Sequence, residues 1–258
     1  MMCYSDDALP PDAPGIHSPA RSEDLVLTSR DGNHFSAYAA WPSAPTGATV
    51  IIYPDVRGLH QFYKSLALRF AEVGITALAI DYFGRTAGLT ARDDSFEYRS
   101  HVMQIQFDHF KLDVQTALGY LHEKIATDTS VFVMGFCLGG TFALLSSTLP
   151  EFGFAGAIPF YANLSRTFAG QGTVLDVAEK IVYPVLGLFG GADEGIPEVQ
   201  RQELDSKLTT AHVEHTIYAY PGAPHSFFDR KATDFADASS DAWQRVLAFI
   251  QRHTLQPS

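Results

Sequence analysis

The chain has 258 residues, of which 46% are hydrophobic and 18% are charged. This length and composition predict one large folded domain with a sizeable core, and they exclude disordered and fibrous classes. The formal net charge is −11. Because an acidic surface repels phosphate groups, we expect neither nucleic acid nor a membrane surface as a partner.

Residues 1–22 are predicted to form an extended leader, since prolines and glycine disfavour regular structure there (Pro10, Pro11, Pro14, Gly15 and Pro19). The leader has neither a basic start nor an apolar run, so we expect no signal peptide. No stretch approaches the roughly 20 apolar residues of a membrane helix. The two cysteines, Cys3 and Cys137, show no metal or redox spacing, and a reducing cytoplasmic location is expected.

Residues 23–258 are predicted to form a single domain. Residues 23–28 and 34–41 flank Asp31-Gly32, a hairpin signal. Short apolar runs then alternate with segments of helical spacing. The expected strands are 48–53, 75–80, 131–134, 156–161, 184–189 and 215–220, and the expected helices are 62–73, 107–124, 139–147, 199–208 and 241–253. This alternation predicts an α/β fold with a mostly parallel central sheet and helices on both faces. The polar segment 86–101 is expected to be a loop or short helix near the substrate.

The most specific motif is GFCLGG at residues 135–140, which follows one predicted strand and opens a helix. It has the pattern of a nucleophile elbow with cysteine in place of serine. Side chains at Gly135 and Gly139 would collide with neighbouring backbone in such a turn. The helix N-terminus would favour the thiolate of Cys137. The alternative is a tight strand-to-helix turn that holds a buried structural cysteine.

Two polar residues complete a possible triad. Asp193 follows a predicted strand in GGAD, and His225 follows the last strand in PGAPH. Each alone is typical of an ordinary turn or loop. Together they give the chain order nucleophile, acid, histidine that is usual in α/β-hydrolases. We therefore predict that Cys137 attacks an ester carbonyl to form a thioester, that His225 moves the proton, and that Asp193 orients His225.

The oxyanion of such a reaction needs backbone N–H donors. We expect one from Leu138, the residue after the nucleophile, and one from Val56, in the loop after strand 48–53. The scattered histidines and the missing nucleotide-binding motifs predict no metal and no cofactor.

At this point the sequence resembles the dienelactone hydrolase family, also called carboxymethylenebutenolidases. The resemblance runs from about Leu25 to the end of the chain and rests on YPDVRG, IDYFGR, GFCLGG, GGAD and PHSFFDR. The leader MCYSDD is also similar to that of some members of the wider family. The resemblance implies an α/β-hydrolase fold and a small ester or lactone as substrate.

The resemblance also implies roles for charged residues. Asp55 matches an acidic residue that modulates the thiol, although the best-known form of the family has glutamate there. Arg85 and Arg230 match or lie near arginines that bind the substrate carboxylate, a task suited to a planar guanidinium. Arg57 is an additional basic candidate. The alternatives are a loop residue paired with Arg57 for Asp55, and surface ion pairs for the arginines. Aromatic residues expected to line the pocket are Phe83, Phe136 and Phe228.

Two other functions remain open at this stage. The first is a non-catalytic receptor or carrier of a small molecule, although binding alone needs no nucleophile. The second is a thiol sensor in which Cys137 is reversibly oxidised, although no resolving cysteine lies nearby in the sequence. A monomer or a homodimer is expected.

Overall fold

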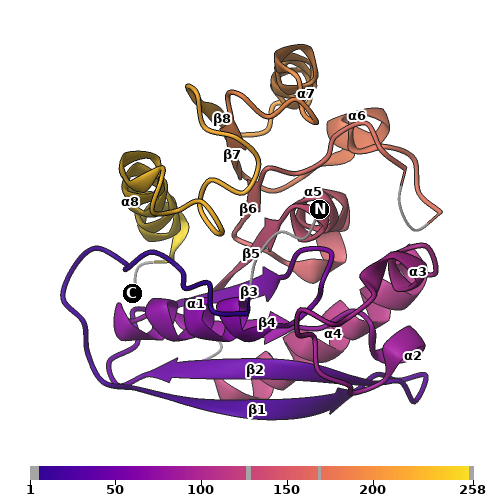
Figure 1. Ribbon diagram of the computed structural model, residues 1–258, viewed down its shortest axis with the longest axis vertical. Helices are drawn as coiled ribbons and strands as arrows, with labels where there is room; N and C mark the ends of the chain where they lie inside the picture. The colour runs from indigo at the N-terminus through magenta and orange to yellow at the C-terminus, as the bar shows by residue number, and fades with distance from the viewer. Residues whose placement is uncertain (1–5, 126–128, 168–169, 256–258) are drawn as a thin grey trace.

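A computed structural model describes residues 6–125, 129–167 and 170–255 of the chain. Its centre is an eight-stranded sheet in the order β1-β2-β4-β3-β5-β6-β7-β8 (Figure 1). The strands β3 to β8 are parallel, whereas β1 and β2 form an antiparallel hairpin at one edge. The strand bounds are Ala20–Thr28 (β1), His34–Pro42 (β2), Ala48–Tyr53 (β3), Thr76–Ile80 (β4), Ser130–Phe136 (β5), Gly156–Phe160 (β6), Val185–Gly190 (β7) and His215–Tyr220 (β8).

Helices cover both faces of this sheet (Figure 1). On one face α1 and α8 meet through the rings of Phe70 and Trp243, whose centroids are 4.8 Å apart. On the other face α4 and α5 meet through Phe110 and Phe142, at 4.7 Å. The helix bounds are Gln61–Glu72 (α1), Gly84–Ala87 (α2), Tyr98–Val102 (α3), Phe107–Lys124 (α4), Leu138–Ser146 (α5), Val174–Val177 (α6), Glu198–Thr210 (α7) and Ala236–His253 (α8), with short 3₁₀ turns at Pro150–Phe152 and Ala178–Lys180.

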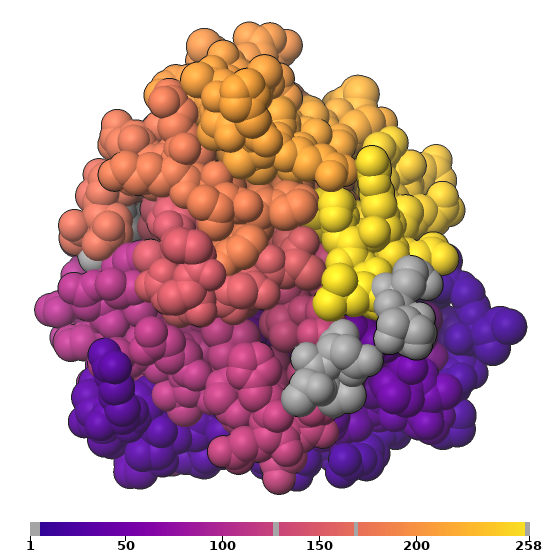
Figure 2. Space-filling model, turned by 180° about the vertical axis from the view of Figure 1, so that it is seen from behind, coloured from indigo at the N-terminus to yellow at the C-terminus, as the bar shows by residue number. Residues whose placement is uncertain are grey.

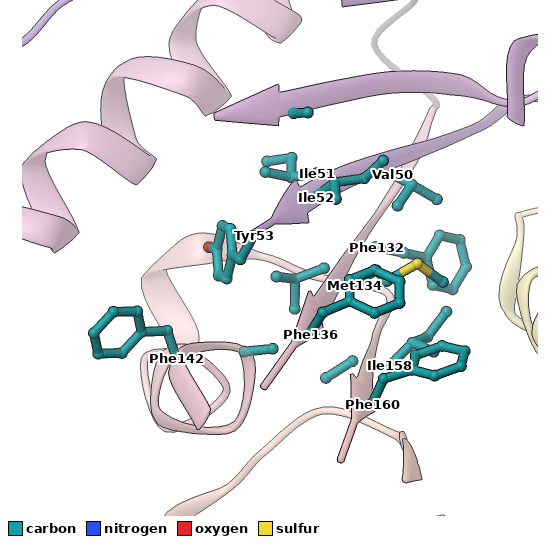
Figure 3. Close-up of a cluster of buried hydrophobic side chains, with 14 of the residues drawn as sticks. Val50, Ile51, Ile52, Tyr53, Phe132, Met134, Phe136, Phe142, Ile158 and Phe160 are labelled. Carbon is teal, nitrogen blue, oxygen red and sulfur yellow. The ribbon is translucent and has the colours of Figure 1, made fainter. Parts of the chain in front are cut away.

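The core lies around the central strands β3, β5 and β6. Every residue of these three strands is buried, as expected for parallel strands covered on both faces. Figure 3 shows their side chains gathered at the centre, with Phe136 beside Phe160. These two rings stack with centroids 4.8 Å apart. The carboxyl end of β5, which leads into the elbow, is therefore held rigidly from both sides.

The predicted fold is confirmed. Most element bounds lie within two residues of their predicted positions, and two differ by more. Strand β1 begins at Ala20, inside the predicted leader, because residues 20–22 pair with the end of β2 at an edge where polar side chains can face water. Helix α8 begins at Ala236 instead of 241, since Ser239 is buried and donates a hydrogen bond to the Phe227 carbonyl. The segment 86–101 contains the end of α2 and the start of α3.

The leader from residue 6 to residue 19 packs against the domain. The indole N–H of Trp243 donates to the Pro11 carbonyl at 3.0 Å, and the Ser18 amide donates to the Glu72 carbonyl at 2.8 Å. These contacts lie on α8 and at the end of α1. In the view from behind, the yellow C-terminal residues lie between the indigo N-terminal residues and the orange residues of the second half of the chain (Figure 2). Cys3 lies outside the described residues.

Within the described part of the chain, no helix combines the length and the apolar character needed to cross a bilayer.

Candidate active site

Cys137 occupies the turn between β5 and α5 in a strained conformation. Its φ of 53° and ψ of −112° lie in a region that residues other than glycine rarely adopt. Its amide donates a hydrogen bond to the Phe160 carbonyl at 3.0 Å, so the turn is tied to the neighbouring strand β6. The half-buried Cys137 is the N-cap of α5, and its sulfur is therefore at the positive end of a helix.

The glycines of the elbow are required by close backbone approach. A Cβ atom on Gly135 would lie 2.0 Å from the Gly139 carbonyl oxygen. A Cβ atom on Gly139 would lie 2.1 Å from the Tyr53 carbonyl oxygen and 2.2 Å from that of Pro54. Since Tyr53 ends β3, the first turn of α5 is packed directly against the loop that follows β3.

His225 and Asp193 meet at the same edge of the sheet. Asp193 follows β7 and His225 follows β8, and the imidazole Nδ1 lies 2.6 Å from Asp193 Oδ2. The other carboxylate oxygen of Asp193 accepts a hydrogen bond from the Gly195 amide at 3.0 Å. The Asp193 carboxylate is buried and held from two sides, which fixes the orientation of the imidazole.

The surroundings of His225 favour its protonated form. Burial by itself would lower the pKa of His225, but hydrogen bonds with Asp193 and Cys137, together with their negative charges, raise the pKa to about 10. His225 thus pairs with Asp193 on one side and with Cys137 on the other. An imidazolium beside a cysteine stabilises the thiolate, which is the nucleophilic form of that side chain.

The loop after β3 is fixed on several sides. The Asp55 amide donates to the Tyr63 hydroxyl at 2.9 Å, and the Tyr82 hydroxyl donates to the Pro54 carbonyl at 3.0 Å. Gly58 closes the loop with a φ of 79°, where a Cβ atom would lie 2.3 Å from Asp81 Oδ1. Val56 is therefore presented by a rigid turn.

Val56 and Leu138, the two expected oxyanion donors, lie on segments that touch each other. Leu138 begins α5, whose first turn packs against the Val56 loop at Gly139. Among the described residues, no acceptor pairs with the backbone N–H of either Val56 or Leu138. Both donors are free of internal hydrogen bonds in this part of the structure, as an oxyanion site requires.

Asp55 is completely buried beneath the same loop. Its Oδ1 accepts a hydrogen bond from the Arg57 amide at 3.0 Å and lies 3.6 Å from His60 Nε2. Within the described residues, Asp55 Oδ2 has no hydrogen-bond partner. The carboxylate therefore both shapes its own turn and leaves one buried oxygen for another group.

Two of the three arginines expected to contact substrate form ion pairs with carboxylates of the protein itself. Arg57 is completely buried, and its guanidinium is bound by Asp6 and Asp94. Arg85 forms ion pairs with Asp31 at 2.8 Å and with Asp113. Both guanidinium groups are thus engaged by carboxylates of the protein itself, because the aspartates come from distant segments that fold against them.

Arg230, the third expected arginine, is exposed to solvent and lies five residues after His225.

The three expected pocket aromatics are all buried in the core. Phe136 stacks against both Phe160 and Phe228, which also contact each other, and Phe228 contacts Trp243. Phe83 packs against Tyr82 and under the guanidinium of Arg92. They support the walls behind the site, since large apolar side chains at strand ends are stabilised most by burial in the core.

Sequence reasoning missed two residues beside His225. Tyr161 directly follows β6 with a φ of 35°, and its ring lies 4.9 Å from that of His225. Its hydroxyl donates a hydrogen bond to Asp229, which is buried four residues after His225. Burial is the main cause that raises the pKa of Asp229 well above its ordinary value, and nearby Asp55 adds to the effect. The position of Tyr161 at a strand end was the available signal.

Metal ligation has no support in the described residues, where no group of three or more histidine, cysteine, aspartate or glutamate side chains could hold an ion.

Comparison with known proteins places this geometry in a family. The model of the dienelactone hydrolase family matches residues 35–254. A Yersinia pestis protein named "Putative carboxymethylenebutenolidase" is 28% identical over 229 residues, covering 86% of this chain and 85% of that protein. A Bradyrhizobium protein named "Probable 2-oxo-3-(5-oxofuran-2-ylidene)propanoate lactonase" is 27% identical over 240 residues, covering 89% of this chain and 94% of that protein.

Solved structures show the same fold. The crystal structure of a "Putative Dienelactone Hydrolase" from Klebsiella pneumoniae superposes with a TM-score of 0.79 at 21% identity, covering 91% of this chain and 100% of that one. The mostly parallel eight-stranded sheet agrees with this match. The chain therefore belongs to the dienelactone hydrolase family and has the α/β-hydrolase fold.

Proposed function

We propose that the protein hydrolyses small esters or lactones with Cys137 as the nucleophile. The observation that carries the proposal is the arrangement at the elbow. A strained Cys137 at the N-terminus of α5 hydrogen-bonds His225, and His225 lies 2.6 Å from Asp193. A structural cysteine would need neither the strained turn nor an imidazole oriented by a buried carboxylate.

In the first half of the reaction, Cys137 Sγ attacks the carbonyl carbon and a C–S bond forms. The carbonyl oxygen becomes an oxyanion that accepts hydrogen bonds from the Leu138 and Val56 amides. Collapse of this intermediate breaks the ester C–O bond and leaves a thioester. His225 gives its proton to the departing alkoxide, which in a lactone stays attached to the acyl chain.

In the second half, His225 is neutral and takes a proton from water as that water attacks the thioester carbonyl. The C–S bond then breaks, the carboxylic acid leaves, and the thiolate and imidazolium are restored. Asp193 stays ionised and holds Nδ1 throughout. Asp55 is the candidate for modulating the thiol, since its buried Oδ2 has no hydrogen-bond partner among the described residues.

Family membership and the Bradyrhizobium relative named as a lactonase support this substrate class. Arg57 and Arg85 are bound to aspartates, so we do not assign them to a substrate carboxylate. Arg230 remains the candidate for that role.

Intact-protein mass spectrometry after rapid mixing with p-nitrophenyl acetate tests the nucleophile. An acetyl adduct that maps to Cys137 and decays with time is expected, and Cys137→Ala should show neither adduct nor turnover. Turnover that persists in Cys137→Ala would refute the assignment. If iodoacetamide alkylates Cys137 but p-nitrophenyl acetate leaves no acetyl adduct, the thiol is accessible but does not accept the acyl group of this ester.

A further inference from the structure

The buried guanidinium of Arg57 connects the oxyanion loop to the N-terminal leader. Arg57 directly follows Val56 in the chain, and its side chain is completely buried. Its Nη2 lies 2.6 Å from Asp6 Oδ1 and 3.1 Å from the Arg92 carbonyl oxygen, and its Nη1 lies 3.0 Å from Asp94 Oδ1. Two carboxylates from segments about 50 and 40 residues away in sequence therefore share one guanidinium.

The two carboxylates also bind each other's backbone. The Asp94 amide donates to Asp6 Oδ2 at 2.9 Å, and the Asp6 amide donates to Asp94 Oδ2 at 3.1 Å. The hydrogen bond from the Asp94 amide is the largest cause that lowers the pKa of Asp6, and Arg57 acts in the same direction. Asp6 is therefore a carboxylate at neutral pH, and it is fixed by three separate contacts.

The rest of the leader brings Asp6 to this place. Between Asp6 and β1, the leader is attached to α8 through the bond from Trp243 to Pro11 and to α1 through the ion pair of Asp12 with Arg69 at 2.7 Å. Ala13 is buried in the core. The described part of the leader thus follows a defined path over the domain, and its Asp6 contacts the guanidinium that adjoins the oxyanion loop.

We propose that Asp6 is a positioning residue of the active site, which holds the Val56 amide in place through Arg57. The proposal rests on the proposed function, in which Val56 is an oxyanion donor. Asp6 touches no reacting atom. Its effect passes through the guanidinium, whose displacement would move the adjoining peptide. Oxyanion donors contribute about 10²–10³-fold to kcat, and a shift of about 1 Å in a positioned group costs on the order of 10²-fold.

Asp6→Asn is the test, and Asp12→Asn is its matched control. Both replacements remove a leader carboxylate that pairs with an arginine, but Arg69 lies on α1 and does not adjoin the oxyanion loop. With p-nitrophenyl acetate, we expect kcat of Asp6→Asn to fall about 10-fold, equivalent to about 1.4 kcal/mol, with little change in KM. Asp12→Asn should keep the kcat of the intact protein. Asp94→Asn, which removes the negative charge beside Arg57 Nη1, should act like Asp6→Asn.

Alkylation of Cys137 by iodoacetamide supplies a readout that a general loss of structure would move. This reaction uses the thiolate and its His225 partner but develops no oxyanion. We therefore expect the same alkylation rate and pH profile in Asp6→Asn as in the intact protein. A parallel drop in alkylation and kcat would assign the effect to general loosening and overturn the proposal.

The remaining outcomes distinguish failure of the positioning role of Asp6 from failure of the proposed hydrolase function. Turnover by the intact protein with equal kcat in Asp6→Asn and Asp12→Asn would overturn the role of the leader and leave the proposed function standing. Absence of turnover and of a Cys137 adduct in the intact protein would overturn the proposed function, and the role of Asp6 with it.

Discussion

Replacement of Gly139 by alanine tests the close approach on which the site depends. The added methyl group would lie 2.1 Å from the Tyr53 carbonyl oxygen and 2.2 Å from that of Pro54, which are both backbone atoms. An ordinary carbon–oxygen contact is longer by about 1 Å, so the loop after β3 or the first turn of α5 must move by roughly that distance. We expect the free energy of unfolding to fall by about 3 kcal/mol, at the upper end of overpacking costs.

The same movement separates the two oxyanion donors, so kcat should fall as well. A displacement of about 1 Å predicts a loss on the order of 10²-fold. Urea unfolding and turnover of p-nitrophenyl acetate measure the two effects. Gly119→Ala is the matched control, because Gly119 is exposed within α4 and a Cβ atom there meets nothing within 4 Å. It should stabilise the protein by about 0.5–1 kcal/mol. Gly139→Ala with unchanged stability and kcat would refute the close-approach argument.

Three further predictions concern ionisable groups. Protonated His225 is needed to protonate the leaving alkoxide, and its pKa is raised to about 10, so kcat/KM should fall as pH rises through about 10. In Asp193→Asn the same fall should occur at a lower pH, because Asp193 contributes to the raised pKa of His225. The pKa of Asp229 is raised in the folded protein, so as pH rises the unfolded chain releases this proton at a lower pH than the folded protein does. Above about pH 4 the intact protein should therefore lose stability relative to Asp229→Asn, and urea unfolding measures this difference. Arg85→Ala should lower the free energy of unfolding by about 1–3 kcal/mol, because it leaves buried Asp113 without its charged partner, while the KM ratio of an anionic to a neutral ester stays unchanged.

Each of these expectations has a clear contrary result. An alkaline limb at the same pH in Asp193→Asn would show that Asp193 does not set the pKa of His225. A parallel stability profile for Asp229→Asn would mean that the carboxyl ionises normally in the fold. A selective rise in KM for the anionic ester in Arg85→Ala would restore Arg85 as a substrate-binding residue.

The sequence by itself determined the order and type of the main elements. Apolar runs of strand length at 48–53 and 215–220 and helical spacing at 107–124 match β3, β8 and α4 residue for residue. Patterns of this kind report burial and local backbone geometry, which depend on neighbours close in the chain. For the same reason GFCLGG indicated the elbow, because its glycines are required by a tight turn whose geometry is set locally. The chain order of Cys137, Asp193 and His225 then suggested that they meet.

Only the tertiary structure decided which charges are already paired. Arg57 and Arg85 are of the residue type that binds carboxylate ligands. In the structure, however, aspartates 51 and 54 residues away in sequence bind their guanidinium groups. Asp6 lies in MCYSDD and Asp229 in PHSFFDR, but neither motif indicates a role for its aspartate, because the sequence does not distinguish a solvated carboxylate from one buried beside a tyrosine or paired with an arginine. Ion pairs between distant segments depend on the path of the whole chain, and no local pattern encodes them. The sequence predicts the leader only as an extended segment. Its contact with the loop that carries Val56 is decided by the tertiary structure.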